Sequence, residues 1–317
     1  MPQVFDLNFR TARSGGDIDT ERPGQQAQAL RGYPHVIFLI HGYNNDQHDG
    51  EVAYQAFCDR EQTVVGPGRD WAPGAIVVRV FWPGDARWWI ASPVYYPFAV
   101  PRARTIGQAL AAILKDLAQY AGDVLTVDAV AHSLGNRVLL HCLLTLIGSA
   151  NLFTRRMVHM AAAVPTWTLG PTARIELLRN ALLSECSPPG RAASLFSGHD
   201  TVLSLAFPPG ETAADTYDGE FPIALGHAHW GDGDQVADLT QLEAVGAGHG
   251  SYWGADKSTP KLLNHWIRDT VNAQLDLGNG ANRSTATAFM PERQIADARA
   301  ISPRTIEERV TGSSEIS

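Results

Sequence analysis

One stretch, residues 123–137, constrains the fold of this chain more than any other. It reads DVLTVDAVAHSLGNR. Residues 124–130 are largely apolar and rich in β-branched side chains, which predicts a strand buried on both faces of a sheet. From 138 to 146, apolar residues recur at helical spacing. We therefore expect a strand that passes into a helix through a very tight turn, with Ser133 at its apex.

This turn has the form of a nucleophile elbow, G-x-S-x-G, with Ala131 in place of the first glycine. In such an elbow a strained backbone lifts the serine hydroxyl clear of the sheet. The residues two before and two after the serine approach so closely that only small side chains, here Ala131 and Gly135, fit. The N–H of Leu134, at the positive end of the next helix, is placed to stabilise an oxyanion. The alternative is a tight turn without chemistry.

A second junction of strand and loop lies in the first third of the chain. Residues 35–40, HVIFLI, predict a central strand that runs directly into His41, Gly42, Tyr43 and Asn44. Ligands of α/β proteins bind beyond the carboxyl ends of such strands. Gly42 permits a sharp turn, and Tyr43 would supply a second oxyanion-hole N–H. Asn44 or Asn45 would hold the loop shape or cap the next helix; the alternative for the whole junction is an ordinary strand-to-helix turn.

Two residues late in the chain fit the acid and the base in the order serine, acid, histidine. Asp200 follows a predicted strand at 192–197 and would orient the histidine, although it could instead cap the helix that begins at Thr201. His249 lies in a glycine-rich loop after the last predicted strand, 238–245, where a general base belongs. A solvated loop histidine is the alternative, since the chain has 11 histidines. The reserve candidates for the acid are Asp128, Asp232 and Asp234.

An aromatic-rich segment follows the strand predicted at 75–82. Its prolines predict a loop, with a helix beginning only at 104 and ending at 120. As a loop beyond a strand end, 81–100 would form a cap or wall of an apolar substrate pocket; the alternative is a set of aromatic side chains that plug the core. The residues expected to bind substrate are His41, Gly42, Asn44, His132, Trp82, Trp88 and Trp89.

The remaining patterns alternate between strand and helix, which predicts a doubly wound, mostly parallel α/β sheet with helices on both faces. Residues 1–277 would form one catalytic domain. The polar tail, 278–317, is expected to be flexible or to contact a partner subunit in a homo-oligomer. The other expected elements are strands at 4–11 and 157–164, helices at 51–61, 171–183 and 259–275, and a loop at 14–32.

Composition excludes several classes of function. The net charge of −8 argues against a nucleic-acid partner. Three widely spaced cysteines exclude a full disulfide framework, and a buried free thiol is expected at Cys142. No stretch is long enough to span a membrane and the N-terminus lacks a signal pattern, so we expect a cytoplasmic protein. A metal site is disfavoured because its candidate ligands, His227, His229, Asp232 and Asp234, crowd one loop.

Together these motifs resemble the α/β-hydrolase superfamily. The likeness is greatest to a largely uncharacterised bacterial branch of esterase- and lipase-like hydrolases with an H-G-Y-N or H-G-F-N loop, a W-P pair, A-H-S-[LM]-G-N-R and a late G-H-x-x-Y. Here the W-P is Trp82-Pro83 and the late segment begins at Gly248. The resemblance covers residues 33–269; Ala131 departs from the usual elbow glycine, a small-for-small change.

The resemblance implies a serine hydrolase with Ser133 as nucleophile, His249 as base and Asp200 as acid. We expect it to cleave a small carboxylic ester with an apolar part through an acyl-enzyme, without a cofactor or metal. The same triad would serve an acyltransferase, amidase or thioesterase. A hypothesis of another class is a non-catalytic binding protein that keeps this fold.

Overall fold

The computed structural model describes residues 2–85, 92–122, 124–146, 149, 151–166, 192–214, 222–228, 239–275 and 277. All of them fall within residues 1–279, which form one unit. The predicted domain boundary and tail therefore stay predictions. Three parts of the sequence analysis lie outside the described residues: the helix predicted at 171–183, the segment 86–91 with Trp88 and Trp89, and Cys186.

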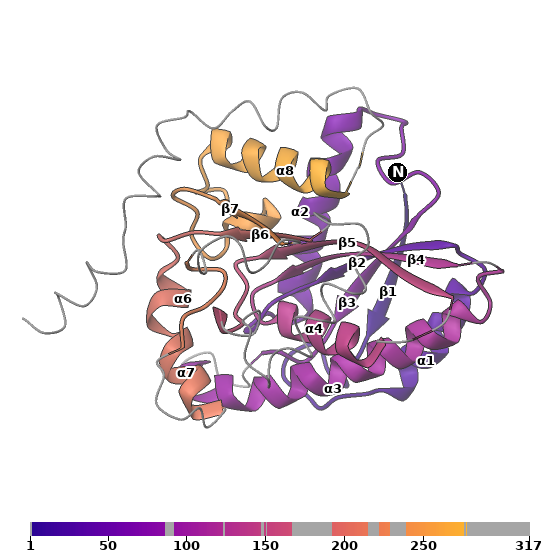
Figure 1. The fold of residues 1–317 in the computed structure, drawn as a ribbon, viewed down its shortest axis with the longest axis horizontal. Coiled ribbons are helices and arrows are strands. Elements are labelled where there is room, and N and C mark those ends of the chain that lie inside the picture. Colours follow the sequence, from indigo (N-terminus) through magenta and orange to yellow (C-terminus); the bar gives the residue numbers. More distant parts are fainter. Residues whose placement is uncertain are drawn as a thin grey trace, which may run out of the picture. The chain divides into compact units, whose positions relative to one another are not determined.

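The described strands form one sheet in the order β1-β3-β2-β4-β5-β6-β7, and every pairing in it is parallel (Figure 1). This confirms the predicted parallel α/β architecture. Because all strands point the same way, the loops after them gather at one edge of the sheet. The strands are β1 (Gln3–Asn8), β2 (His35–Ile40), β3 (Ile76–Phe81), β4 (Leu125–His132), β5 (Leu152–Met160), β6 (Ala192–Phe196) and β7 (Leu239–Glu243).

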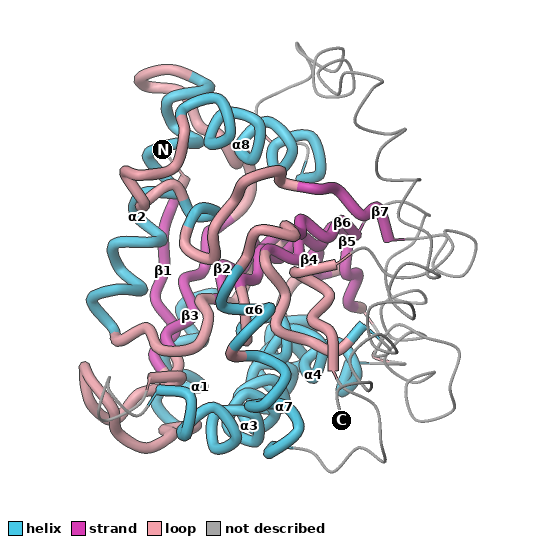
Figure 2. Tube along the Cα trace, turned by 90° about the vertical axis from the view of Figure 1, so that its left-hand side faces the viewer, coloured by secondary structure: helices cyan, strands magenta, loops and turns pink. Residues whose placement is uncertain are grey.

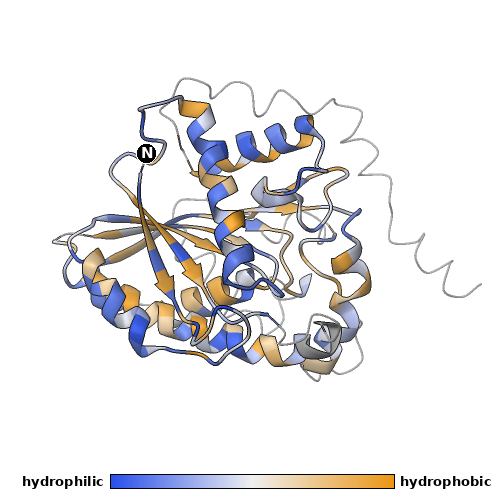
Figure 3. Cartoon of the chain, turned by 180° about the vertical axis from the view of Figure 1, so that it is seen from behind, coloured by the Kyte–Doolittle hydropathy of each residue, from blue (hydrophilic) through white to orange (hydrophobic). Residues whose placement is uncertain are grey.

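Helices cover both faces of the sheet, as predicted. α1 (Glu21–Ala27), α3 (Ser92–Ala118) and α4 (Gly135–Leu146) lie on one face, and α2 (Gln47–Val65) and α8 (Lys261–Leu275) lie on the other (Figures 1 and 2). The sheet is hydrophobic between helices whose outer sides are largely hydrophilic (Figure 3). None of the helices in the described ranges has the length and apolar character needed to cross a bilayer.

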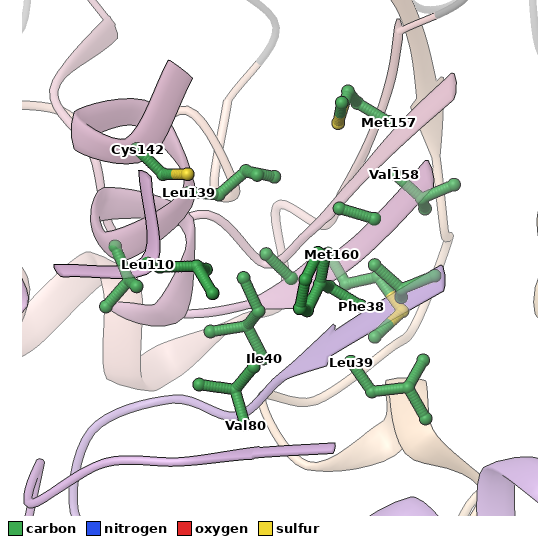
Figure 4. Packing of buried hydrophobic residues seen from close by; sticks show 14 of the residues in the cluster. Phe38, Leu39, Ile40, Val80, Leu110, Leu139, Cys142, Met157, Val158 and Met160 are labelled. Carbon is green, nitrogen blue, oxygen red and sulfur yellow. The ribbon is translucent and has the colours of Figure 1, made fainter. Parts of the chain in front are cut away.

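The core forms where the apolar stripe of α4 meets the central strands. Leu139 and Cys142 of α4 and Leu110 of α3 lie beside Ile40 of β2, and all are at most 3% exposed (Figure 4). This packing explains why strands buried on both faces read as continuous apolar runs. The predicted buried free thiol at Cys142 is confirmed, and burial raises the pKa of that thiol.

Two predictions of local structure were wrong. α3 begins at Ser92 and runs through Pro97 and Pro101, where a loop was expected. Pro97 is partly buried and Pro101 is exposed, while Val100 and Ala103 are buried against the core, so packing of the inner face offsets the lost N–H groups. Residues 92–100 are therefore not a loop cap. α1 likewise forms within the loop predicted at 14–32, because its buried Pro23 and Ala27 pack inward.

Candidate active site

The turn between β4 and α4 has the strained geometry expected of a nucleophile elbow. Ser133 has a φ of +53°, in the left-handed region that non-glycine residues rarely adopt. Its N–H donates to the carbonyl of Met160 (2.9 Å), and its own carbonyl accepts from the N–H of Ala163 (3.1 Å). The end of β5 and the loop after it therefore hold the Ser133 main chain through both its N–H and its carbonyl.

Asn136 is a structural residue of the elbow that sequence analysis missed. Its side chain is fully buried, and its Nδ2 donates to the carbonyls of Ser133 (3.0 Å) and Met160 (3.2 Å). This leaves Oδ1 to accept from Nδ1 of His159 (2.8 Å), which fixes the tautomer of that ring. Burial lowers the pKa of His159 to about 4, so the ring stays neutral. An amide in the first helical turn after the serine is the one signal that could have indicated this role.

The structure brings Ser133, His249 and Asp200 into one hydrogen-bonded line. The His249 Nε2 lies 2.9 Å from the Ser133 Oγ, and its Nδ1 lies 2.8 Å from the Asp200 Oδ2. A carboxylate can only accept, so Nδ1 carries the proton and Nε2 presents its lone pair to the serine hydroxyl. Asp200 is fully buried, while the His249 side chain is 20% exposed. His249 is thus both held by a carboxylate and accessible.

Asp200 combines the two roles that the sequence left as alternatives. One carboxylate oxygen, Oδ2, accepts from His249, and the other, Oδ1, accepts from the N–H of Leu203 (3.0 Å). Asp200 is therefore also the N-cap of α6 (Thr201–Leu205), which is followed by α7 (Phe207–Ala214). The reserve acid Asp128 is instead paired with His35 (2.9 Å) and Arg155 in the sheet. Asp232 and Asp234 lie outside the described residues.

The loop after β2 packs directly against the elbow. A Cβ built on Gly42 would lie 2.6 Å from the Ser133 Cβ, and one on Gly135 would lie 2.3 Å from the carbonyl oxygen of His41. The closest approach at Gly135 is therefore to the end of β2. The loop that carries Tyr43 therefore packs against the turn that carries Leu134.

Arg10 binds main-chain carbonyls in and next to this loop, and no sequence motif predicted this role. Its side chain is fully buried and forms an ion pair with Asp85. Its Nη1 donates to the carbonyls of Trp82 (2.8 Å) and Asn45 (3.3 Å). The neighbouring Asn44 is exposed with a φ of +59°, and its N–H donates to Gly84 (3.0 Å). Asn44 therefore helps hold the loop shape, as one of its predicted roles required.

Three side chains predicted to face the substrate are buried instead. His41 and Trp82 are each 0% exposed, and their rings stack with centroids 5.7 Å apart. The Trp82 Nε1 donates to the His41 carbonyl (2.9 Å), and the Trp82 N–H donates to the His41 Nε2 (3.2 Å). Burial lowers the pKa of His41 to about 3. His132 is 5% exposed. His41 and Trp82 therefore expose no surface, whereas His132 is about as exposed as Ser133, which is 4% exposed.

Metal binding receives no support from the described part of the chain. Within it, no three His, Cys, Asp or Glu residues are grouped so that they could hold an ion. Of the H-A-H loop, His227 is described, whereas His229 and the two aspartates after it are outside the described ranges.

The parallel sheet, the serine elbow after β4, the acid after β6 and the histidine after β7 together define the α/β-hydrolase fold. No family model and no curated protein matches this chain. Similar solved structures include the lin2722 gene product of Listeria innocua, at 14% identity and a TM-score of 0.40 over 78% of this chain and 96% of that one. TT1662 from Thermus thermophilus has 14% identity and a TM-score of 0.40 over 76% and 87% of the two chains.

A third similar structure is the alpha/beta hydrolase domain-containing protein 10 from mouse. It is 13% identical to this chain, with a TM-score of 0.36, and the match covers 78% of this chain and 91% of that one.

The contact at Gly135 leads to a prediction about stability. Gly135→Ala should lower the free energy of unfolding by about 1–3 kcal/mol, because its Cβ would force the main chain at His41 to move. Urea denaturation at neutral pH measures the change. Gly198→Ala is the matched control, since a Cβ there meets nothing within 4 Å. Equal denaturation midpoints for the two variants would contradict the close approach.

Proposed function

We propose that this protein is a serine hydrolase that cleaves carboxylic esters through an acyl-enzyme intermediate. The observation that carries the proposal is the unbroken line from the buried Asp200 carboxylate through His249 to the Ser133 hydroxyl, with both hydrogen bonds below 3.0 Å. Three residues distant in sequence meet at the carboxyl edge of the sheet in the geometry that activates a serine.

In the proposed reaction, His249 accepts the proton of Ser133 at Nε2 while the serine Oγ attacks the ester carbonyl. The N–H groups of Leu134 and Tyr43 stabilise the negative oxygen of the tetrahedral intermediate. The tetrahedral intermediate then collapses: the bond to the ester oxygen breaks, the imidazolium gives its proton to that oxygen, and the alcohol leaves. Water, deprotonated by His249, attacks the acyl-enzyme, and the acid product departs from Ser133. Asp200 accepts the hydrogen bond from Nδ1 throughout and stabilises the imidazolium.

An apolar substrate part is supported by aromatic rings beside the oxyanion loop. The partly buried ring of Tyr43 meets Tyr96 of α3 edge to face at 5.6 Å, and Tyr96 meets Phe207 of α7 at 6.1 Å. Tyr96 and Phe207 are themselves buried, so the partly buried Tyr43 is the ring of this group that could contact an acyl chain bound at the serine. The lipase-like character of the proposal rests on this feature.

The test is covalent capture together with turnover. We expect a fluorophosphonate probe to modify the peptide that contains Ser133, and p-nitrophenyl esters of increasing acyl length to be hydrolysed. Adding alcohol or amine acceptors separates a hydrolase from an acyltransferase, and amide and thioester substrates test the remaining alternatives. A folded protein that is neither labelled nor active would support the binding-protein hypothesis instead.

A further inference from the structure

His132, the residue before Ser133, is linked to the main chain of the proposed base. Its Nε2 lies 2.8 Å from the carbonyl oxygen of His249. Because a carbonyl can only accept, Nε2 carries the proton of the neutral ring. The His132 Nδ1 is buried and has no hydrogen-bond partner among the described residues. Burial, followed by the nearby charge of His249, lowers the pKa of His132 to about 3.

The His132 ring is confined on several sides. A Cβ on Gly42 would lie only 3.1 Å from its Nδ1, so the loop after β2 blocks one side. The rings of Tyr252 and Trp253 lie 6.0 and 6.1 Å away, and the His249 ring lies 4.9 Å away. The donor at Nε2 therefore has a fixed position relative to the elbow.

The loop that carries His249 has little else to fix it at that residue. Within the described ranges, one hydrogen bond to the His249 main chain is found, and it comes from His132. The adjacent turn is closed by hydrogen bonds between Gly248 and Ser251. His249 also lies between two glycines, which restrict the backbone least. Its side chain is held through Asp200, and its backbone through His132.

We propose that His132 is a positioning residue, which fixes the His249 backbone relative to Ser133 through this hydrogen bond. The inference rests on the proposed function, since it matters for catalysis only if His249 is the base. The elbow then fixes the positions of both residues. It positions Ser133 directly, and it positions His249 through the side chain of His132. His132 itself touches no reacting atom.

Two substitutions of His132 distinguish the effect of this hydrogen bond from that of a polar side chain at the same position. The amide nitrogen of glutamine can occupy the position of the histidine Nε2, whereas that of asparagine reaches only the position of Nδ1. We expect His132→Gln to keep kcat within about threefold of wild type. His132→Asn should lower kcat about 10- to 100-fold with KM unchanged, because a small displacement of the base has a large effect on rate.

Nuclear magnetic resonance of the imidazole N–H groups gives a readout that does not depend on turnover. The His249 Nδ1 proton, bound to Asp200, should stay protected from solvent exchange in wild type and His132→Gln, and should exchange faster in His132→Asn. In the wild type, the His132 Nε2 proton should also be protected at neutral pH. This last measurement needs no variant, so it tests the inference even if a variant fails to fold.

Equal exchange of the His249 proton in both variants, or an unprotected His132 Nε2 proton in the wild type, would overturn the inference. Urea denaturation of both variants shows whether a fall in kcat reflects lost stability; a fall that follows stability in both would also overturn it. If wild type hydrolyses no ester but the proton exchange follows the expected pattern, the proposed function fails while the positioning role stands.

Discussion

Ser133→Ala is expected to lower kcat for p-nitrophenyl esters by about 10⁴-fold or more and to abolish fluorophosphonate labelling. The hydroxyl is the one group placed to form the acyl-enzyme, since the His249 Nε2 points at its Oγ from 2.9 Å. Removing it leaves only the oxyanion N–H groups and substrate binding to assist attack by water. Initial rates over a range of substrate concentrations measure the loss.

Ser194→Ala is the matched control for this experiment. Ser194 is also fully buried, on β6, and its Oγ has no hydrogen-bond partner among the described residues. Its removal should leave both kcat and labelling unchanged. Equal activity of wild type and Ser133→Ala would exclude Ser133 as the nucleophile, and equal losses in the two serine variants would point to a general effect on folding.

Acid is expected to unfold this protein between about pH 6 and pH 4. Burial lowers the pKa of His41 and His132 to about 3 and that of His159 to about 4, from 6.5 in the unfolded chain. Below pH 6.5 the unfolded state therefore binds protons that the folded state does not, so stability is complete above that pH and is lost as the pH falls. Three such groups give a slope of about 4 kcal/mol per pH unit.

That slope, acting over two pH units, matches the whole stability of a typical domain, which is about 5–15 kcal/mol. Urea denaturation at a series of pH values measures it. His159→Asn places an amide nitrogen where Nδ1 donates to Asn136 and removes one titrating ring. The slope for this variant should fall by about one third. A wild-type free energy of unfolding that is flat between pH 6 and pH 4 would show that these rings are not held neutral.

The features that sequence analysis predicted are those that local pattern determines. β2 has the predicted bounds, 35–40. After His35 it consists of five consecutive apolar residues, a pattern that indicates a buried strand. The elbow at Ser133 followed from the strand before it and the helical spacing after it. The meeting of Asp200 and His249 could be predicted because parallel strands bring the loops that follow them to one edge.

What the sequence did not reveal depends on contacts between distant segments. Arg10 and Asn136 satisfy main-chain carbonyls that approach only in the folded protein, so nothing in their own neighbourhood marks them. The burial of His41 and Trp82 depends on β2 and β3 pairing side by side. The helix through Pro97 was missed because proline was treated as ending a helix, whereas inward packing by the residues around it sustains the helix.

The left-handed backbone of Ser133 has a consequence for how this chain can change over evolutionary time. Glycine would occupy that conformation with less strain, so the side chain is kept at some cost in stability. Relaxing the turn would give a sturdier molecule with no alcohol at the sheet edge. Stability and the reactive hydroxyl are thus opposed at this residue. The hydrogen bonds that Met160 and Ala163 form with the Ser133 main chain help to stabilise the strained turn that carries the hydroxyl.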